Sequence, residues 1–360
     1  MTETIKEIPE TVKLTQYSHG AGCGCKIAPK VLEEILQSSV HYPVDKNLLV
    51  GNSSRDDAAV YDIGNGMALI STTDFFMPIV DDAFDFGRIA SANAISDVYA
   101  MGGKPIMAIA ILGWPVEKLS TALAQEVLNG ARDICAKAGI PLAGGHSIDT
   151  AEPMFGLAVS GTVQIENLKQ NNTAEENDLI FLTKPIGVGI LSTAQKRGLL
   201  KDEYLDVMID QMATLNKQGE ALGKIKTITS MTDVTGFGLL GHLIEMAEGA
   251  NLSAELFYTR IPVIEGAKEY LLQRIVPDAT YRNWNSYSSK VGFEKGVNVI
   301  EAFNLLPDPQ TNGGLLFSVK ESGVTEVVKL LKDIGLDDYT IPIGKFIKRG
   351  DKIIQVKIGS

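Results

Sequence analysis

Residues 58–101 read AAVYDIGNGMALISTTDFFMPIVDDAFDFGRIASANAISDVYAM, and this stretch sets the pattern of the fold. Two apolar runs, 58–61 and 67–72, flank an Asn65-Gly66 pair, an arrangement typical of a β-hairpin. Further along, the apolar residues of 84–101 recur at helical spacing, and a Gly-Gly pair ends the run. The stretch therefore predicts two paired strands followed by an amphipathic helix.

The same mixture of strands and helices continues on both sides of this stretch. The predicted strands are 105–112, 154–163, 178–183, 226–231, 251–258, 315–319 and 352–357. The predicted helices are 120–138, 189–198, 204–223, 238–248 and 325–334. Because these elements interleave without a strict βαβ rhythm, the pattern favours an α+β fold over a doubly wound sheet.

A chain of 360 residues is long for one hydrophobic core, and its length indicates roughly two domains. The polar stretch 166–178 is the best candidate for the boundary between them. We expect a flexible glycine-rich N-terminal segment over 1–26, a first domain over 27–168 and a second, α+β domain over 169–360.

Composition limits the partners that the protein can have. The formal charge is -11, from 44 acidic and 33 basic residues, which argues against nucleic acid or an anionic membrane surface as the main partner. The first residues lack a secretory signal, and the apolar run 105–116 is too short to span a membrane and reads as a buried strand. With three cysteines and no disulfide framework, the sequence predicts a cytoplasmic protein.

Carboxylates stand at the ends of predicted strands and on the predicted helix 84–101. Asn93 and Asp97 share one face of that helix, among apolar residues, so Asp97 should be partly buried and need a partner or a metal. The group consists of Asp56, Asp57, Asp74, Asp97 and Asp233. Oxygen ligands without nearby His or Cys pairs suit Mg²⁺ or Mn²⁺ better than zinc. Aspartates are also common in turns and caps, so spacing alone leaves both interpretations open.

The glycine-dense segment 18–26, SHGAGCGCK, predicts a mobile loop. Lys26 close to a thiol favours the thiolate, so Cys23 or Cys25 could act as a nucleophile or bind a soft atom. A zinc half-site would need two more ligands, and Cys135 is expected on a buried helix face. A plain surface loop is the remaining alternative.

Two glycine patterns could serve a nucleotide. Residues 236–241, GFGLLG, match the dinucleotide-binding pattern and precede Glu255 by about 20 residues, which makes a NAD-dependent oxidoreductase the second hypothesis. Asp233 just before this turn would repel a pyrophosphate unless a metal intervened. Close packing of the helix against the strand, with a mobile turn, is therefore the preferred explanation of these glycines. Residues 144–147 predict a tight turn that could approach a phosphate or a ribose. A P-loop is excluded, because Cys25 precedes Lys26 where that motif requires glycine.

Taken together, these segments resemble the selenophosphate synthetase (selenide, water dikinase) family over about 14–356. The blocks that carry the resemblance are 17–26 (YSHGAGCGCK), 55–61 (RDDAAVY), 71–78 (STTDFFMP), 93–97 (NAISD), 101–105 (MGGKP), 143–147 (AGGHS), 231–241 (MTDVTGFGLLG) and 308–315 (DPQTNGGL). One departure is Asn312, where the family pattern leads us to expect serine.

The resemblance implies that ATP, hydrogen selenide and water become selenophosphate, AMP and phosphate, with Mg²⁺ as cofactor. It also implies an aminoimidazole ribonucleotide synthetase-like fold, in which the first domain binds ATP and metal and forms a homodimer. By position, it makes Cys23 and Lys26 catalytic, and Asp57, Asp97 and Asp233 magnesium ligands. The implied ATP contacts are Lys26, Ser54, Arg55, Asp56, Asp74 and Asp97, with Gly145, His146 and Ser147 reaching the nucleotide of the neighbouring subunit. Another ATP-dependent kinase of this fold and a non-catalytic nucleotide sensor remain alternatives.

Overall fold

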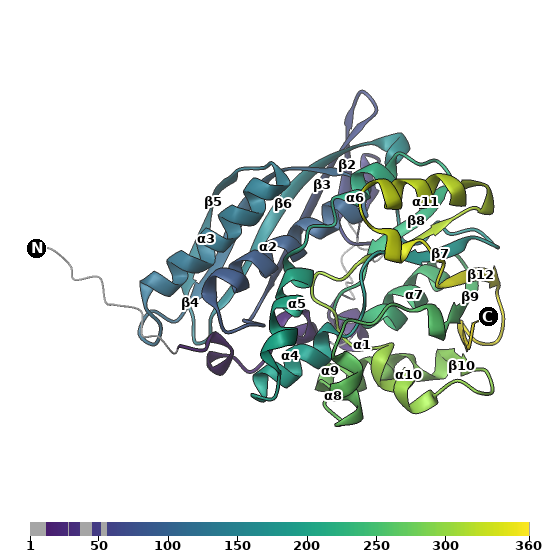
Figure 1. Cartoon of the computed structure of the whole chain (residues 1–360). Coiled ribbons are helices and arrows are strands. Elements are labelled where there is room, and N and C mark those ends of the chain that lie inside the picture. Colours follow the sequence, from purple (N-terminus) through teal and green to yellow (C-terminus); the bar gives the residue numbers. More distant parts are fainter. Residues whose placement is uncertain (1–11, 28, 37–44, 52–55, 360) are drawn as a thin grey trace, which may run out of the picture.

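The structure is a computed structural model that describes residues 12–27, 29–36, 45–51 and 56–359 (Figure 1). The first half of the chain forms a six-stranded sheet in the order β1-β2-β3-β6-β4-β5. The strand bounds are β1 Leu48–Val50, β2 Ala59–Gly64, β3 Met67–Phe76, β4 Lys104–Trp114, β5 Leu142–Asp149 and β6 Met154–Gln164. Neighbouring strands are antiparallel, except that β4 and β5 run parallel.

The hairpin predicted around Asn65-Gly66 is confirmed. These two residues have positive φ angles of 55° and 74°, as a tight two-residue turn requires, and β2 pairs antiparallel with β3. The predicted helices that follow are also confirmed, as α2 (Ala83–Ala100) and α3 (Thr121–Ala138).

Helices α2 and α3 lie side by side over one face of the six-stranded sheet (Figure 1). Their backbones approach closely at two glycines: a Cβ on Gly87 would lie 1.9 Å from the Val127 carbonyl oxygen, and one on Gly130 would lie 1.9 Å from the Phe84 carbonyl oxygen. Helix α2 is buried along almost its whole length and contacts β3, β6 and, in the other half of the chain, α5 and β8. It therefore packs against both halves of the chain.

The second half forms a seven-stranded mixed sheet in the order β10-β13-β9-β12-β7-β11-β8. The strand bounds are β7 Leu179–Leu182, β8 Ile228–Asp233, β9 Leu252–Phe257, β10 Val291–Phe293, β11 Leu315–Val319, β12 Gly344–Lys348 and β13 Ile354–Lys357. The helices, with α1 from the N-terminal part, are α1 Pro29–Leu36, α4 Val188–Lys196, α5 Asp202–Ala213, α6 Gln218–Gly223, α7 Gly238–Gly249, α8 Ala267–Leu272, α9 Asp278–Tyr287, α10 Val299–Leu305 and α11 Val324–Asp333. Two mixed sheets with helices packed against them confirm the α+β class.

Three expectations about elements are wrong. The helix predicted over 204–223 is broken into α5 and α6, because Asn216 between them donates hydrogen bonds to Ser96 Oγ and to the Gly313 carbonyl. Residues 144–147 belong to strand β5 rather than to a tight turn. Strand β4 is not buried on both faces, since Met107 and Ile109 are 41% and 43% exposed.

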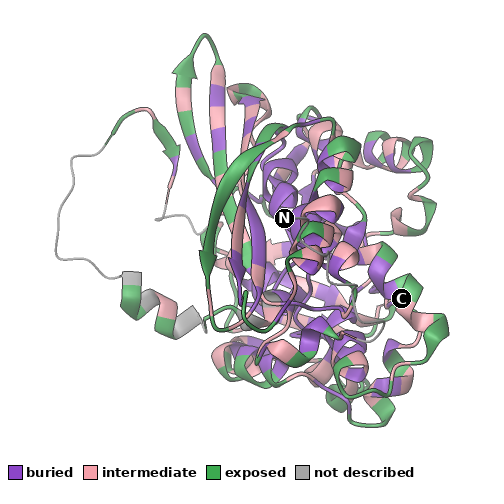
Figure 2. Cartoon of the chain, turned by 90° about the vertical axis from the view of Figure 1, so that its left-hand side faces the viewer, coloured by how far each residue is buried: buried purple, intermediate pink, exposed green. Residues whose placement is uncertain are grey.

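Those two residues belong to an open face of the six-stranded sheet. Met107 pairs with Ser160, and Ile109 pairs with Ala158, so both point away from the helix-covered side. Exposed positions follow one another along this side of the sheet in Figure 2. In the described residues, no helix combines the length and hydropathy needed to cross a membrane.

Candidate active site

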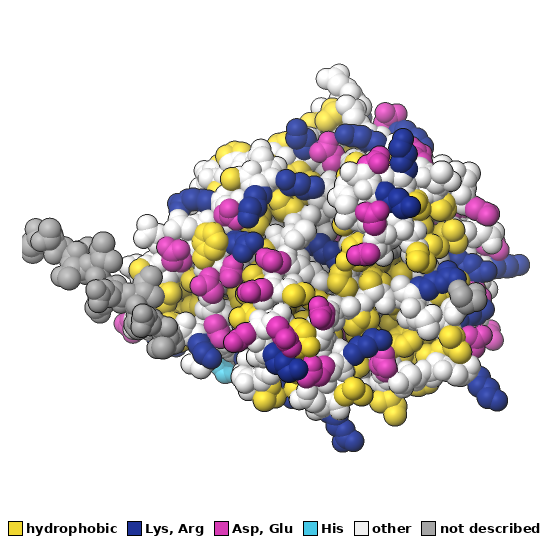
Figure 3. All heavy atoms as spheres, viewed as in Figure 1, with side chains coloured by type: hydrophobic (Ala, Val, Ile, Leu, Met, Phe, Trp, Pro, Cys, Tyr) yellow, Lys and Arg dark blue, Asp and Glu magenta, His cyan; other side chains and the backbone are white. Residues whose placement is uncertain are grey.

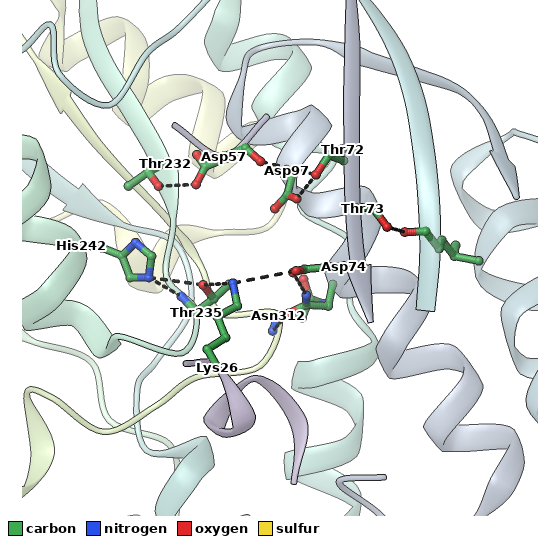
Figure 4. Close-up of polar contacts among 12 residues, drawn as sticks. Lys26, Asp57, Thr72, Thr73, Asp74, Asp97, Thr232, Thr235, His242 and Asn312 are labelled. Atoms are coloured by element: carbon green, nitrogen blue, oxygen red, sulfur yellow. Dashed lines mark hydrogen bonds and ion pairs between the residues drawn. The ribbon is translucent and has the colours of Figure 1, made fainter. Parts of the chain in front are cut away.

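A cavity of about 600 Å³ lies where the two halves of the chain meet. Strands β2 and β3 and helix α2 line it from the first half, and residues 233–245 line it from the second. Lys26 enters it from the N-terminal segment, and Figure 4 shows this side chain between Asp74 and Thr235. Asp56, Asp57, Asp74, Asp97 and Asp233 all line this cavity, so the carboxylates singled out from the sequence are brought together.

Asp57 and Asp97 are each held by a threonine hydroxyl (Figure 4). Thr232 Oγ1 on β8 donates to Asp57 Oδ1 at 2.8 Å, and Thr72 Oγ1 on β3 donates to Asp97 Oδ2. The burial expected for Asp97 is confirmed, since this residue is 7% exposed. The two carboxylates thus have fixed orientations toward the cavity.

The carboxylates raise each other's pKa. Burial raises the pKa of Asp57 well above its usual value, and the charges of Asp233 and Asp97 add to the effect. Burial likewise raises the pKa of Asp97, with further contributions from Asp74 and Asp233, and raises that of Asp233 to about 6. Negative charge is therefore concentrated here without enough compensation from the described side chains.

A divalent cation fits this arrangement. Asp57 Oδ2 and Asp233 Oδ2 are buried, and neither accepts a hydrogen bond from any described residue. A cation would supply the missing partner and offset the repulsion among the three carboxylates. No group of three or more His, Cys, Asp or Glu side chains within the described ranges is arranged to hold a metal by itself, so phosphate or water oxygens would have to complete the coordination.

Asp74 is oriented through a chain of hydrogen bonds that begins in the second half of the molecule. The backbone N–H of Asn312 donates to Asn93 Oδ1 at 2.7 Å, and Asn93 Nδ2 donates to Asp74 Oδ2 at 2.6 Å. Asn312 has a positive φ of 48°, and its side chain donates to the carbonyls of Met212 and Thr214. The backbone conformation and the amide N–H groups of this asparagine are therefore accommodated, whereas its buried Oδ1 accepts no hydrogen bond from the described residues.

Lys26 places its ammonium group between two acceptors. Its Nζ lies 3.5 Å from Thr235 Oγ1 and 3.9 Å from Asp74 Oδ1. Thr235 is itself held by the buried His242, whose Nε2 accepts from the Thr235 backbone N–H at 3.1 Å. Burial lowers the pKa of His242 to about 3, so the ring is neutral at physiological pH and serves as an acceptor.

Asp56 connects the two halves beside the cavity. Its Oδ1 accepts from the Asn171 backbone N–H at 2.8 Å. The next candidates before it, Ser54 and Arg55, lie outside the described residues.

The glycine-dense segment is held beside the cavity. Residues 22–25 form a short 3-10 turn that packs against β3, and a side chain at Gly22 would collide with Ile79 and Thr311. Lys196 Nζ donates to the carbonyls of residues 18–20 at 3.0–3.3 Å. The backbone of Cys23 is thus placed close to Lys26, whereas the side chains of Cys23 and Cys25 lie outside the described part. Cys135 is buried on α3, as expected.

Gly145, His146 and Ser147 do not line the cavity. They lie exposed on β5, at the edge of the six-stranded sheet. A Cβ on Gly145 would lie 2.3 Å from the Ala110 carbonyl oxygen, so glycine is required here by the close pairing of β4 and β5.

The structure does not favour a dinucleotide site at 236–241. Strand β8, which precedes this turn, pairs antiparallel with β11, so the parallel βαβ setting is missing from the described sheet. A Cβ on Gly238 would lie 2.6 Å from the Pro307 carbonyl carbon, which explains that glycine by packing. Glu255 is engaged by Lys345 and Lys357.

Sequence reasoning missed the residues that hold the carboxylates and Lys26. Thr72, Thr232 and His242 are ordinary constituents of strands and helices, and no spacing rule marks them. Thr72 lies in the block 71–78, Thr232 lies in the block 231–241, and His242 directly follows it. Only this proximity to the family blocks could have indicated the three residues.

Comparison with known families confirms the fold. Residues 55–163 match the model of the AIR synthase related protein N-terminal domain, and residues 175–357 match that of the C-terminal domain. The crystal structure of the hydrogenase maturation protein HypE in complex with ATP covers 88% of both chains with a TM-score of 0.64 and 17% identity. Thiamine-monophosphate kinase from Stenotrophomonas maltophilia covers 86% of this chain and 91% of its own, with a TM-score of 0.62 and 18% identity.

Much closer relatives are found among curated sequences. The selenide, water dikinase of Cronobacter sakazakii is 53% identical over 349 residues, which are 97% of this chain and 99% of that protein. The selenide, water dikinase of an Enterobacter species is 56% identical over 327 residues, which are 91% of this chain and 93% of that one. With such identity over nearly its full length, and with the blocks and the fold described above, the chain belongs to the selenide, water dikinase family.

Proposed function

We propose that the protein converts ATP, hydrogen selenide and water into selenophosphate, AMP and phosphate, with Mg²⁺ as its cofactor. The observation that carries the proposal is the meeting of Asp57, Asp97, Asp233 and Lys26 in one cavity between the two halves of the chain. Such a cavity is suited to the triphosphate of ATP, because phosphoryl transfer depends on positioning and charge neutralisation more than on covalent chemistry of the protein.

The cation and the lysine would share the phosphate charges. Mg²⁺ held by Asp57, Asp97 and Asp233 would neutralise the phosphates and make the phosphorus easier to attack. Lys26, placed by Asp74 and Thr235, adds a positive charge on the side of the glycine segment. We assign the remaining ATP contacts to Asp56 and Asp74, and to Ser54 and Arg55 by their positions in the sequence.

Cys23 is the proposed catalytic thiol. It follows Gly22 in the turn beside β3, three residues before Lys26, so its backbone lies at the entrance through which Lys26 reaches the phosphates. Its thiolate, favoured by the nearby Lys26, would serve as a nucleophile or as a proton acceptor for a substrate that enters at this turn. Selenide is oxidised readily, so this reaction also requires a reducing compartment such as the cytoplasm.

A homodimer is the proposed active form. The open face of the six-stranded sheet carries exposed apolar side chains on neighbouring strands, and apolar patches of this kind are typical of interfaces. They are Tyr61, Phe75, Met107, Ile109 and Ile148. The exposed edge strand β5 adjoins this face, so Gly145, His146 and Ser147 could reach the nucleotide of the second subunit. On the opposite, helix-covered side of the molecule, which Figure 3 shows, acidic and basic side chains are mixed and form no broad basic surface for nucleic acid.

Two assays test the proposed function. Protection from heat unfolding by Mg-ATP, but not by NAD, is expected, because only a bound ligand stabilises the folded state. Release of AMP that depends on selenide should follow in the same preparation. Protection by NAD, or release of ADP as the final product, would contradict the proposal.

A further inference from the structure

A second, much smaller cavity lies on the other side of Lys26 and is not explained by ATP binding. Its volume is about 10 Å³, close to the minimum that one water-sized group needs. Gly24 and Lys26 form one wall, and Ala279 and Arg282 on α9 form the opposite wall. Gly24 is flanked in the sequence by the two loop cysteines, so the cavity lies directly at the proposed catalytic segment.

The cavity carries positive charge. The exposed Arg282 lines it together with Lys26, whose ammonium is directed toward Thr235 and Asp74, and its described lining contains no acidic side chain. Arg282 Nη2 donates to the Gly24 carbonyl at 2.9 Å, which ties α9 to the glycine segment, and a guanidinium has further N–H donors for a ligand. The amide of the neighbouring Asn283 is engaged by the carbonyls of Gly236 and Pro307, which makes that part of the wall rigid.

Lys26 and Phe237 line both cavities, so these two side chains form the partition between the small cavity and the large one. A small anion held beneath Gly24 would therefore be separated from the phosphates only by this partition. The limited volume favours an anion with one heavy atom over phosphate, selenite and other oxyanions, because the smaller anion needs smaller shifts of the exposed Lys26 and Arg282 side chains.

We propose that this small cavity between the glycine segment and α9 is the holding site for the hydrogen selenide anion, with Arg282 as its recognition residue. The inference rests on the proposed function, for which selenide is a substrate. Hydrogen selenide is more acidic than a thiol and is singly charged at neutral pH, so a small site beside the guanidinium of Arg282 matches its charge. Lys26, whose ammonium is directed toward Thr235 and Asp74, would then stand between the anion and the phosphates.

Four variants test the site through the selenide concentration that gives half-maximal selenophosphate formation under anaerobic conditions. Arg282→Gln keeps an N–H donor for Gly24 but removes the charge, and Ala279→Leu fills the cavity. Arg282→Lys restores the charge. Arg349→Gln is the matched control, because Arg349 also donates to one backbone carbonyl, that of Leu252, far from the cavity in the sequence.

We expect Arg282→Gln and Ala279→Leu to raise the half-maximal selenide concentration by about tenfold or more, with the KM for Mg-ATP changed by less than about twofold. Arg282→Lys should recover most of the loss, and Arg349→Gln should behave like the parent protein. Unchanged selenide dependence in the first two variants would overturn the proposal. A parallel rise in the KM for Mg-ATP would also overturn it, because Arg282 would then only hold the glycine segment.

Failure of the proposed function can be distinguished from failure of this site. If the parent protein makes no selenophosphate, the proposed function is wrong, and the site is then tested by calorimetry with sodium hydrosulfide as the probe. Heat of binding in the parent protein that is lost in Ala279→Leu would still support the small-anion site. Equal heats of hydrosulfide binding in the parent protein and in Ala279→Leu, or no heat of binding in the parent protein, would overturn the proposed site.

Discussion

At the scale of single residues, the buried carboxylates are placed for ligand binding rather than for stability. Asp233 is 1% exposed, its Oδ2 accepts no hydrogen bond from the described residues, and its pKa is raised to about 6 by burial. An ionised carboxylate in this position destabilises the unliganded protein, as is common where function requires concentrated charge.

The first prediction follows from this opposition between stability and the binding of a cation. Asp57→Asn, Asp97→Asn and Asp233→Asn should each lower ATP cleavage by at least about a hundredfold, because each removes charge that holds the cation at the phosphates. The melting temperature without ligand should stay equal or rise. Turnover and thermal unfolding are measured on the same preparations, and near-normal turnover in two of the three variants would refute the metal assignment.

A second residue-scale prediction concerns Asp308, which is fully buried and has a pKa raised to about 8 by burial. The folded state binds its proton more tightly than the unfolded state, whose value is near 3.8. This contribution to stability is therefore complete below about pH 4 and is lost as the pH rises through 8. Asp308→Asn should flatten the fall in melting temperature between about pH 4 and pH 8. The exposed Asp351→Asn serves as control, and an identical pH profile in parent and Asp308→Asn would contradict the assignment.

The sequence identified the carboxylates but not their supports. Aspartates at strand ends form a recognisable pattern, and the cavity contains every one that was singled out. Thr232 and His242 act through contacts between residues from different elements, which periodicity and spacing do not encode. Thr232 on β8 orients Asp57, and His242 on α7 holds Thr235 next to Lys26. Both contacts exist only in the folded arrangement of these elements.

At the scale of elements, helices with clear caps and apolar periodicity were predicted correctly, and helices without them were missed. Helix α3 begins at a Ser120 cap, whose side chain accepts from Leu123 N–H, and ends at Gly139 in the left-handed conformation. Helices α8 and α10 are short, and α9 is largely polar on its exposed side, so no clear periodicity marks them. The break between α5 and α6 depends on Asn216, whose partners lie on α2 and near β11.

The glycine segment is the element that carries the third prediction. Cys23→Ser should abolish selenophosphate formation and leave Mg-ATP binding largely intact, because a hydroxyl keeps the shape of the side chain but cannot form a thiolate. Cys25→Ser should have the milder effect. Lys26→Ala should impair both binding and turnover, since Lys26 lines the large cavity. Selenophosphate yield and ATP affinity are measured side by side, and near-normal yield in Cys23→Ser would show that the thiol is incidental.

At the scale of the whole molecule, two mixed sheets meet along α2, and the cavity lies at that junction. Carboxylates from both halves of the chain therefore surround one site. The sequence of either half alone could not predict this arrangement. The break between the sheets falls between Gln164 and Leu179, and we propose the boundary between domains 27–168 and 169–360 within it.

The fourth prediction concerns the open sheet face. The double substitution Met107→Asp and Ile109→Asp should give a monomer in light scattering, because two charges would be buried in an apolar interface. Activity should fall with dimer content if residues 145–147 serve the nucleotide of the second subunit. Ile334→Asp is the control, since Ile334 is similarly exposed at 46% but lies beyond α11. A fully active monomer would contradict the proposed arrangement.

The central claim is that one site uses both phosphoanhydrides of ATP and transfers phosphorus to selenide. Phosphorus NMR of Mg-ATP with the protein, recorded anaerobically with and without selenide, tests it most directly. We predict selenophosphate, AMP and inorganic phosphate in equal amounts when selenide is present, and no selenophosphate when it is absent. Accumulation of ADP as the final product, or of AMP and phosphate without any selenophosphate in the presence of selenide, would contradict the account.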